Sequence, residues 1–116
     1  MRRILAGLAL ALLIASPVLG KAGASITAPD GLSFGDTFSV TFTEPNHYAG
    51  GLWARADCFQ SGTIVYRQFA YPDGTFTLGP TPSWFGGAAD CTVTLLAIDG
   101  YRGIHEYASD GFSVAP

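Results

Sequence analysis

Hydrophobic and polar residues alternate along much of this chain, and the alternation predicts strands. The clearest case is residues 37–43, where Phe38, Val40 and Phe42 are expected to point to a core while the hydroxyl residues between them face water. No pattern of helical period competes with this one. Residues 37–43 are therefore predicted to form one strand with a single buried face.

Residues 90–100 are the stretch around which the other strands are expected to assemble. Every second residue from Cys91 to Ala97 is apolar, and the opposite face begins with threonines before Leu96 and Ile98 make it apolar too. This pattern predicts a central strand, covered fully on one side and partly on the other. Cys91 has one possible disulfide partner in the chain, Cys58.

Further short strands are expected at residues 25–28, 52–59, 63–70 and 75–78, with a final strand ending at residues 112–114. Proline, glycine, aspartate and serine between them indicate turns at residues 29–31, 60–62 and 71–74. Longer loops are expected at residues 44–50, 79–89 and 99–106. About seven strands without a helix among them predict an all-β sandwich of two antiparallel sheets.

The first 24 residues resemble a secretion signal. Arg2 and Arg3 precede an apolar run over residues 4–15, and small residues at 22–24 offer a cleavage site. We expect a signal-peptide helix over residues 1–24 and a single domain over residues 25–116. An uncleaved anchor is the alternative, but the run is shorter than the ~20 residues that span a bilayer. No stable membrane insertion is expected after cleavage.

Removal of the signal leaves an acidic domain. Residues 25–116 contain three arginines and nine aspartates and glutamates, which gives a net charge of −6. Phosphate backbones and anionic membranes attract clustered lysine and arginine. Neither nucleic acid nor an anionic membrane surface is an expected partner.

Cys58 and Cys91 are the two cysteines of the chain. In an exported domain such a pair favours one disulfide over two free thiols, and the C-x-x-C spacing of a redox pair is absent. Closing the loop between them would contribute about 3–4 kcal/mol by the chain-entropy relation. The protein is accordingly expected to be secreted or to reside in the cell envelope.

Residues 25–116 resemble the immunoglobulin-like sandwich found in secreted bacterial and phage-associated modules. The resemblance is carried by Gly35-Asp36, by Trp53 on the third strand, by residues 90–93 and by residues 112–114. The second strand lacks the cysteine of antibody domains, and Ala89 stands where their tyrosine precedes the second cysteine. The resemblance therefore implies an architecture and not an antibody-type identity.

The resemblance also implies a place for the disulfide. In such a sandwich the third and sixth strands are antiparallel neighbours, and Cys58 ends the third while Cys91 begins the sixth. A bridge within one sheet, near the edge of the core, is expected.

Strand directions bring the loops at residues 44–51, 71–74 and 99–105 to one end of the sandwich. That end would display the candidate binding residues His47, Tyr48, Tyr71, Tyr101, Arg102 and His105. Tyrosine combines a large rigid face with a hydroxyl group and suits recognition. The alternative is that the tyrosines cap the core.

Trp84 and Phe85, in the loop at the opposite end, are two further candidates. A tryptophan in a loop can anchor a sugar or a partner protein. The alternative is that it folds back and closes the end of a small sandwich.

Motifs for catalysis and metal binding are absent from the sequence. His47 and His105 have no H-x-H companion, and the chain has neither an Asp-x-Asp-x-Asp loop nor a G-x-S-x-G motif. We expect no enzyme, no cofactor and no metal site.

These observations favour an exported, non-catalytic binding or adhesion module that acts on a protein or glycan at the cell surface or outside the cell. The alternative is a structural or assembly protein of an envelope or virion, which would associate through the strand at residues 63–70 as a sheet edge guarded by Arg67. An exported inhibitor that presents the loop at residues 79–89 is a third possibility.

Overall fold

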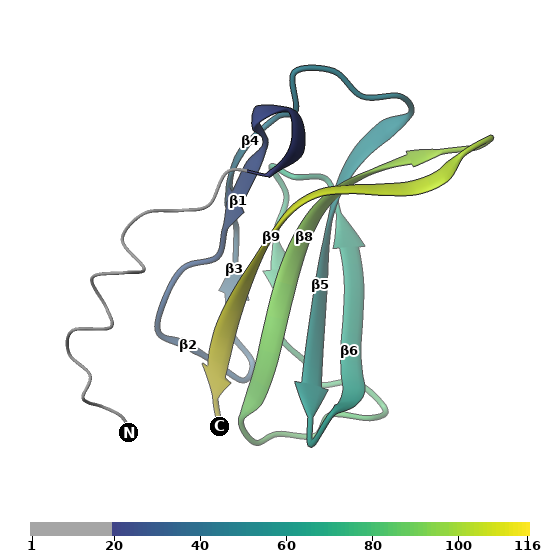
Figure 1. The fold of residues 1–116 in the computed structure, drawn as a ribbon. Helices are drawn as coiled ribbons and strands as arrows, with labels where there is room; N and C mark the ends of the chain where they lie inside the picture. Colours follow the sequence, from purple (N-terminus) through teal and green to yellow (C-terminus); the bar gives the residue numbers. More distant parts are fainter. Residues whose placement is uncertain (1–19) are drawn as a thin grey trace.

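The computed structural model describes residues 20–116, and these residues form an all-β domain (Figure 1). A three-residue 3-10 turn, η1 (Lys21–Gly23), precedes the first strand and is the one helical element of this part of the chain. The predicted signal-peptide helix falls mainly on residues 1–19, which lie outside the described residues. Ala24, the last residue assigned to the signal, is fully buried in the core.

The larger sheet has five strands. In spatial order they are β2 (Leu32–Ser33), β9 (Gly103–Ala115), β8 (Ala89–Asp99), β5 (Gly51–Gln60) and β6 (Thr63–Ala70). Neighbours pair antiparallel except β2 and β9, which are parallel. The prediction of wholly antiparallel sheets is therefore wrong at this edge, where the short β2 returns alongside the end of β9.

Two small antiparallel sheets supply the second layer (Figure 1). They pair β1 (Ser25–Thr27) with β4 (Thr41–Thr43), and β3 (Thr37–Phe38) with β7 (Phe76–Thr77). Ile26, Phe38 and Phe76 from these strands share one buried cluster with Ala54 of β5 and Val93 of β8. The arrangement is compatible with a β-sandwich.

β8 lies in the middle of the five-stranded sheet, as predicted for residues 90–100. Val93 and Leu95 are fully buried in the shared core. Leu96 points to the other face and is also fully buried, whereas Ile98 on the same face is 37% exposed. The predicted difference between a fully covered and a partly covered face is confirmed.

The predicted strand over residues 37–43 is wrong as a single element. It divides at Ser39 and Val40 into β3 and β4, because the first half pairs with β7 and the second half with β1. Phe38 is buried, and Val40 and Phe42 pack against the core from partly buried positions. The alternation of residues predicts the inward face, but it carries no information about which strand lies alongside.

The last strand is longer than predicted. The sequence predicts a loop over residues 99–106, but the turn covers only residues 100–102 and β9 begins at Gly103. Ile104 pairs with Ile98, so the β8–β9 ladder continues beyond the body of the domain (Figure 1). The result is a projecting hairpin in place of a loop.

The disulfide joins Cys58 and Cys91, which are directly opposite each other on β5 and β8 with their Cα atoms 4.0 Å apart. The expected bridge within one sheet is confirmed. The expected position near the edge of the core needs correction, because both residues belong to the buried cluster and are 0% and 4% exposed. At this position both strands direct their side chains towards the core, so the sulfur atoms lie between the two layers.

Candidate functional site

Three loops meet at the end of the domain that carries the β8–β9 hairpin, and they enclose two neighbouring hollows. The first, here called the basic hollow, has a volume of ≈ 380 Å³ and is lined by His47, Tyr48, Ala49, Arg102, His105 and Tyr107. The second, here called the acidic hollow, has a volume of ≈ 330 Å³ and is lined by Phe42, Glu44, Tyr48, Leu52, Tyr71, Pro72 and Asp73. Tyr48 lines both. The structure thus brings together four of the six candidates of this end in one hollow and places Tyr71 in the next.

The loop at residues 44–50 is held in place from two sides. The backbone N–H of Asn46 donates a hydrogen bond to the Ala22 carbonyl oxygen at 2.8 Å, which ties the loop to η1. At the other side Gly50 has a φ of +85°, and a Cβ atom there would lie 2.1 Å from the Ile98 carbonyl oxygen. Only glycine allows this close approach to β8. These contacts position His47 and Tyr48 beside the hairpin.

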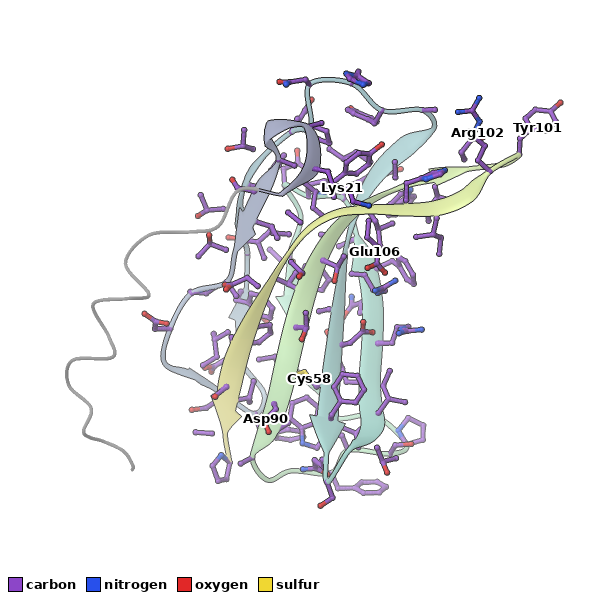
Figure 2. All side chains as sticks on the ribbon, in the orientation of Figure 1. Lys21, Cys58, Asp90, Tyr101, Arg102 and Glu106 are labelled. Atoms are coloured by element: carbon purple, nitrogen blue, oxygen red, sulfur yellow. A yellow bond between two sulfur atoms is a disulfide. The ribbon has the colours of Figure 1, made fainter. Side chains whose placement is uncertain are left out.

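The hairpin presents its turn residues to solvent. The Tyr101 amide donates to the Asp99 carboxylate at 2.9 Å, and Gly103 takes a φ of +82°, so a short polar turn reverses the chain. Tyr101 is 100% exposed. Figure 2 shows Tyr101 and Arg102 together at the tip, which extends away from the sheet. Both residues therefore lie in solvent, away from the buried core.

Tyr71 stacks on Trp53, with ring centroids 4.7 Å apart and an angle of 19° between the rings. Tyr71 follows β6 and Trp53 lies on β5, so the stack joins the two strands at the end of the domain that carries the hairpin. Tyr71 remains 65% exposed. The stack gives the acidic hollow a rigid aromatic wall.

Charge is divided between the two hollows. Among the described residues that line the basic hollow there is one arginine and two histidines but no carboxylate. The acidic hollow has Glu44 and Asp73 and, within the described part of the chain, no basic residue. A local positive site therefore stands out on a domain whose net charge is negative.

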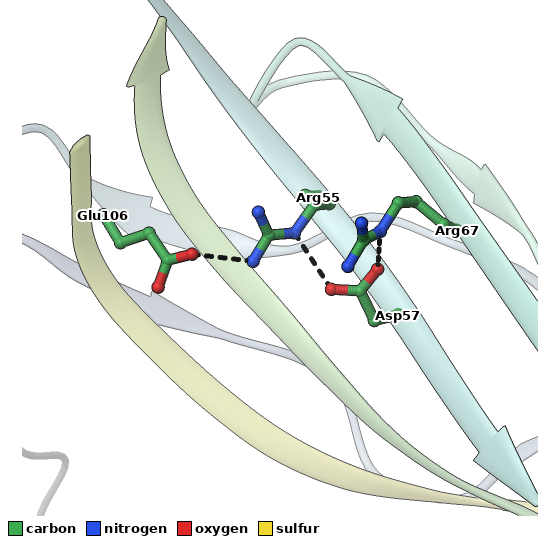
Figure 3. Close-up of polar contacts among 4 residues, drawn as sticks. All are labelled: Arg55, Asp57, Arg67 and Glu106. Carbon is green, nitrogen blue, oxygen red and sulfur yellow. Dashed lines mark hydrogen bonds and ion pairs between the residues drawn. The ribbon is translucent and has the colours of Figure 1, made fainter. Parts of the chain in front are cut away.

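A ladder of ion pairs crosses the outer face of the five-stranded sheet (Figure 3). Arg55 on β5 donates to Asp57 at 2.9 Å and to Glu106 on β9 at 2.9 Å. Arg67 on β6 donates from Nε to the second oxygen of Asp57. This hydrogen bond raises the pKa of Arg67 above its ordinary value. Asp57 accepts hydrogen bonds from both arginines and is only 5% exposed, so it is the buried centre of the ladder.

Asp57→Asn is expected to lower the free energy of unfolding by about 1.5–3 kcal/mol, because it weakens two charge-assisted hydrogen bonds at a buried position. Urea denaturation measures the loss. Asp90→Asn is the matched control, since Asp90 is an exposed carboxylate on the same face, and its effect is expected to stay within about 0.5 kcal/mol. Equal stability of the two variants would contradict a structural role for the ladder.

Trp84 and Phe85 have opposite environments at the other end of the domain. Trp84 is fully buried, and Phe85 is 82% exposed. The Trp84 indole contacts Phe34 and Tyr66 edge-on, with centroids 4.9 Å and 5.9 Å away, and burial raises the pKa of Tyr66 to about 12. Full burial does not suit Trp84 to anchoring a partner at the surface, and it agrees with the alternative, in which Trp84 folds back and closes this end of the sandwich.

A cluster of metal-binding side chains and a membrane-spanning helix were both sought within residues 20–116. This part of the chain contains no group of three or more histidine, cysteine, aspartate or glutamate side chains that could hold a metal ion. None of its helical segments is long and apolar enough to cross a membrane.

Three features of this region have no counterpart among the predictions made from the sequence. Tyr107 was missed as a wall of the basic hollow because it follows the predicted loop at residues 99–106 and so was assigned to the final strand. The Trp53–Tyr71 stack and the Asp57–Arg67 pair follow from the register of the β5–β6 hairpin. The turn at residues 60–62 could have indicated that register, but a bulge at residues 58–59 shifts it by one residue.

Comparison of the chain with protein-family models, with curated proteins and with solved structures gave no match.

Proposed function

We propose that this protein is an exported, non-catalytic binding module that contacts a protein or glycan at the cell surface or outside the cell. The observation that carries the proposal is the gathering of three exposed tyrosines at one end of the fold. Tyr48, Tyr71 and Tyr101 are 37%, 65% and 100% exposed. Tyrosine loses little conformational entropy on binding and offers both an apolar face and a hydrogen-bonding group, which suits it to recognition.

An immunoglobulin-like topology is part of the same proposal. The order β9-β8-β5-β6 corresponds to one sheet of a variable-type domain, and the β3–β7 and β1–β4 pairs correspond to the other. In such domains the loops at one end of a rigid sandwich carry the binding residues. The bridge within one sheet replaces the bridge between sheets that antibody domains have.

Export is supported by two observations. The buried disulfide is consistent with an oxidising compartment outside the cytoplasm. The start of the chain, where Arg2 and Arg3 precede the apolar run over residues 4–15, has the sequence pattern of a secretion signal. Both agree with a partner that lies in the envelope or beyond it.

Substitution at the proposed surface is expected to remove binding. In a screen of the secreted protein against glycans and envelope fractions, Tyr48→Ala and Tyr101→Ala should each weaken binding at least tenfold, which corresponds to about 1.4 kcal/mol per residue. Surface plasmon resonance measures the change.

Phe85→Ala is the matched control for this screen, because Phe85 is an exposed aromatic residue at the opposite end. It should bind as the unmodified protein does. Binding that ignores both tyrosine substitutions but is lost in Phe85→Ala would contradict the proposed location.

Assembly through a sheet edge is the second candidate function. β6 is the edge strand of the five-stranded sheet, and Ile64 and Phe69 on it are 41% and 39% exposed. Arg67 beside them is neutralised by Asp57, so it guards the edge less than a free charge would. Sedimentation analysis at high protein concentration separates the two functions, since a strict monomer argues against assembly.

A further inference from the structure

We infer that the basic hollow takes a sugar residue bearing a carboxylate or a sulfate ester, as part of an acidic glycan. The inference rests on the proposed binding function and names the ligand class of that same site. It is carried by the charge, the donors and the size of the hollow.

Arg102 is the arginine of the described chain whose guanidinium group is not paired with a carboxylate. Arg55 and Arg67 are both held by carboxylates, whereas Arg102 takes part in none of the ion pairs among residues 20–116. No carboxylate of the described chain lines the hollow beside it. A guanidinium group forms two parallel hydrogen bonds with a carboxylate or a sulfate, so Arg102 can supply the main anionic contact.

The other lining residues suit the rest of a sugar. His47 and His105 offer imidazole N–H donors and ring acceptors, and Tyr48 adds a hydroxyl group that both donates and accepts. The ring of Tyr48 also provides an apolar face for the C–H groups of a pyranose. A volume of ≈ 380 Å³ lies at the lower end of the ~300–1,000 Å³ typical of small-ligand sites. The basic hollow therefore accommodates a short segment of a glycan.

The neighbouring hollow favours a glycan over an acidic peptide. A peptide with a run of carboxylates that extended past Tyr48 would meet Glu44 and Asp73, which would repel it. An acidic glycan can place a single charge at Arg102 and present hydroxyl groups to these two acids. Glu44 and Asp73 then accept hydrogen bonds from the sugar.

The test compares charged and neutral forms of the same glycans by isothermal titration calorimetry at about 50 mM salt, where charge contacts are weakly screened. The probes are a neutral oligosaccharide that ends in a single uronate and its methyl ester, an oligosaccharide with a single sulfate ester and its desulfated form, and a glutamate-rich peptide. We expect one charged glycan to bind at least tenfold more tightly than its neutral form. The carboxylated and sulfated pairs distinguish the two anionic groups.

Arg102→Ala should abolish the preference for the charged form. Asp90→Asn, the control, should retain it, because Asp90 is an exposed carboxylate that lines neither hollow and lies at the other end of β8 (Figure 2). Both residues are exposed, so circular dichroism is expected to show unchanged folding of each variant. Equal affinity for charged and neutral glycans, no binding of either charged glycan, or an unchanged preference in Arg102→Ala would overturn the inference. Binding of the peptide alone would also overturn it. Where neutral glycans or envelope fractions still bind in a manner that depends on Tyr48 and Tyr101, the proposed binding function stands without this inference.

Discussion

Trp84→Ala is expected to lower the free energy of unfolding by about 3–5 kcal/mol, the range observed when a large aromatic residue is removed from a core. Trp84 is fully buried and packs edge-on against Phe34 and Tyr66. Its indole N–H also donates to the Gly87 carbonyl oxygen at 3.2 Å. Truncation would leave a cavity between the two layers and a carbonyl without its donor. Guanidinium denaturation followed by circular dichroism measures the loss.

Phe85→Ala provides the control for this substitution. Phe85 is the next residue in the same loop but is 82% exposed, so its truncation should change the free energy of unfolding by no more than about 0.5 kcal/mol. A Trp84→Ala variant that lost less than about 1 kcal/mol would show that the loop at residues 79–88 does not close the core in solution.

Removal of the disulfide is the second large effect. The double variant Cys58→Ala, Cys91→Ala is expected to lose about 3–4 kcal/mol, because the bridge restrains the unfolded chain over a separation of 33 residues. The domain has a modest core, so a loss of this size is a large part of its stability. Thermal unfolding of the purified variant should show a clearly lower Tm, measured against the oxidised protein.

Alkylation of the native protein supplies the control for the bridge. Cys58 and Cys91 are both disulfide-bonded and buried, so neither should react with iodoacetamide until the protein is reduced and unfolded. A double variant as stable as the oxidised protein would contradict the stabilising role of the disulfide.

Strands whose signals are local can be predicted well. The strand predicted at residues 63–70 matches the bounds of β6, because turn residues flank a β-branched and aromatic segment on both sides. β5 is one residue longer than predicted at each end, and β8 begins and ends one residue earlier than predicted. Alternation and turn chemistry are properties of a few adjacent residues, so they are visible in the sequence.

Features that depend on a distant partner could not be predicted in this way. The division of residues 37–43 and the parallel pairing of β2 are decided by which strand supplies the hydrogen bonds. The projecting hairpin was missed because Gly100 and Gly103 flank a polar turn and give the impression of a longer loop. None of these follows from the residues of the segment alone.

The candidate site could be predicted in outline. Strand directions are enough to place His47, Tyr48 and Arg102 at one end, and these residues line one hollow. The separation of basic from acidic residues on the two sides of Tyr48 could not be predicted, because it depends on which side chains face each hollow. The burial of Trp84 likewise depends on how its loop folds back over the core.

The most direct measurement of the proposed binding end is an amide chemical-shift titration of the secreted protein with the tightest ligand from the glycan and envelope screen. We expect the shifts to be confined to residues 44–50, 71–74 and 99–105, which surround the two hollows. Largest shifts in residues 79–88 or along β6, with the hairpin end unchanged, would contradict the proposal.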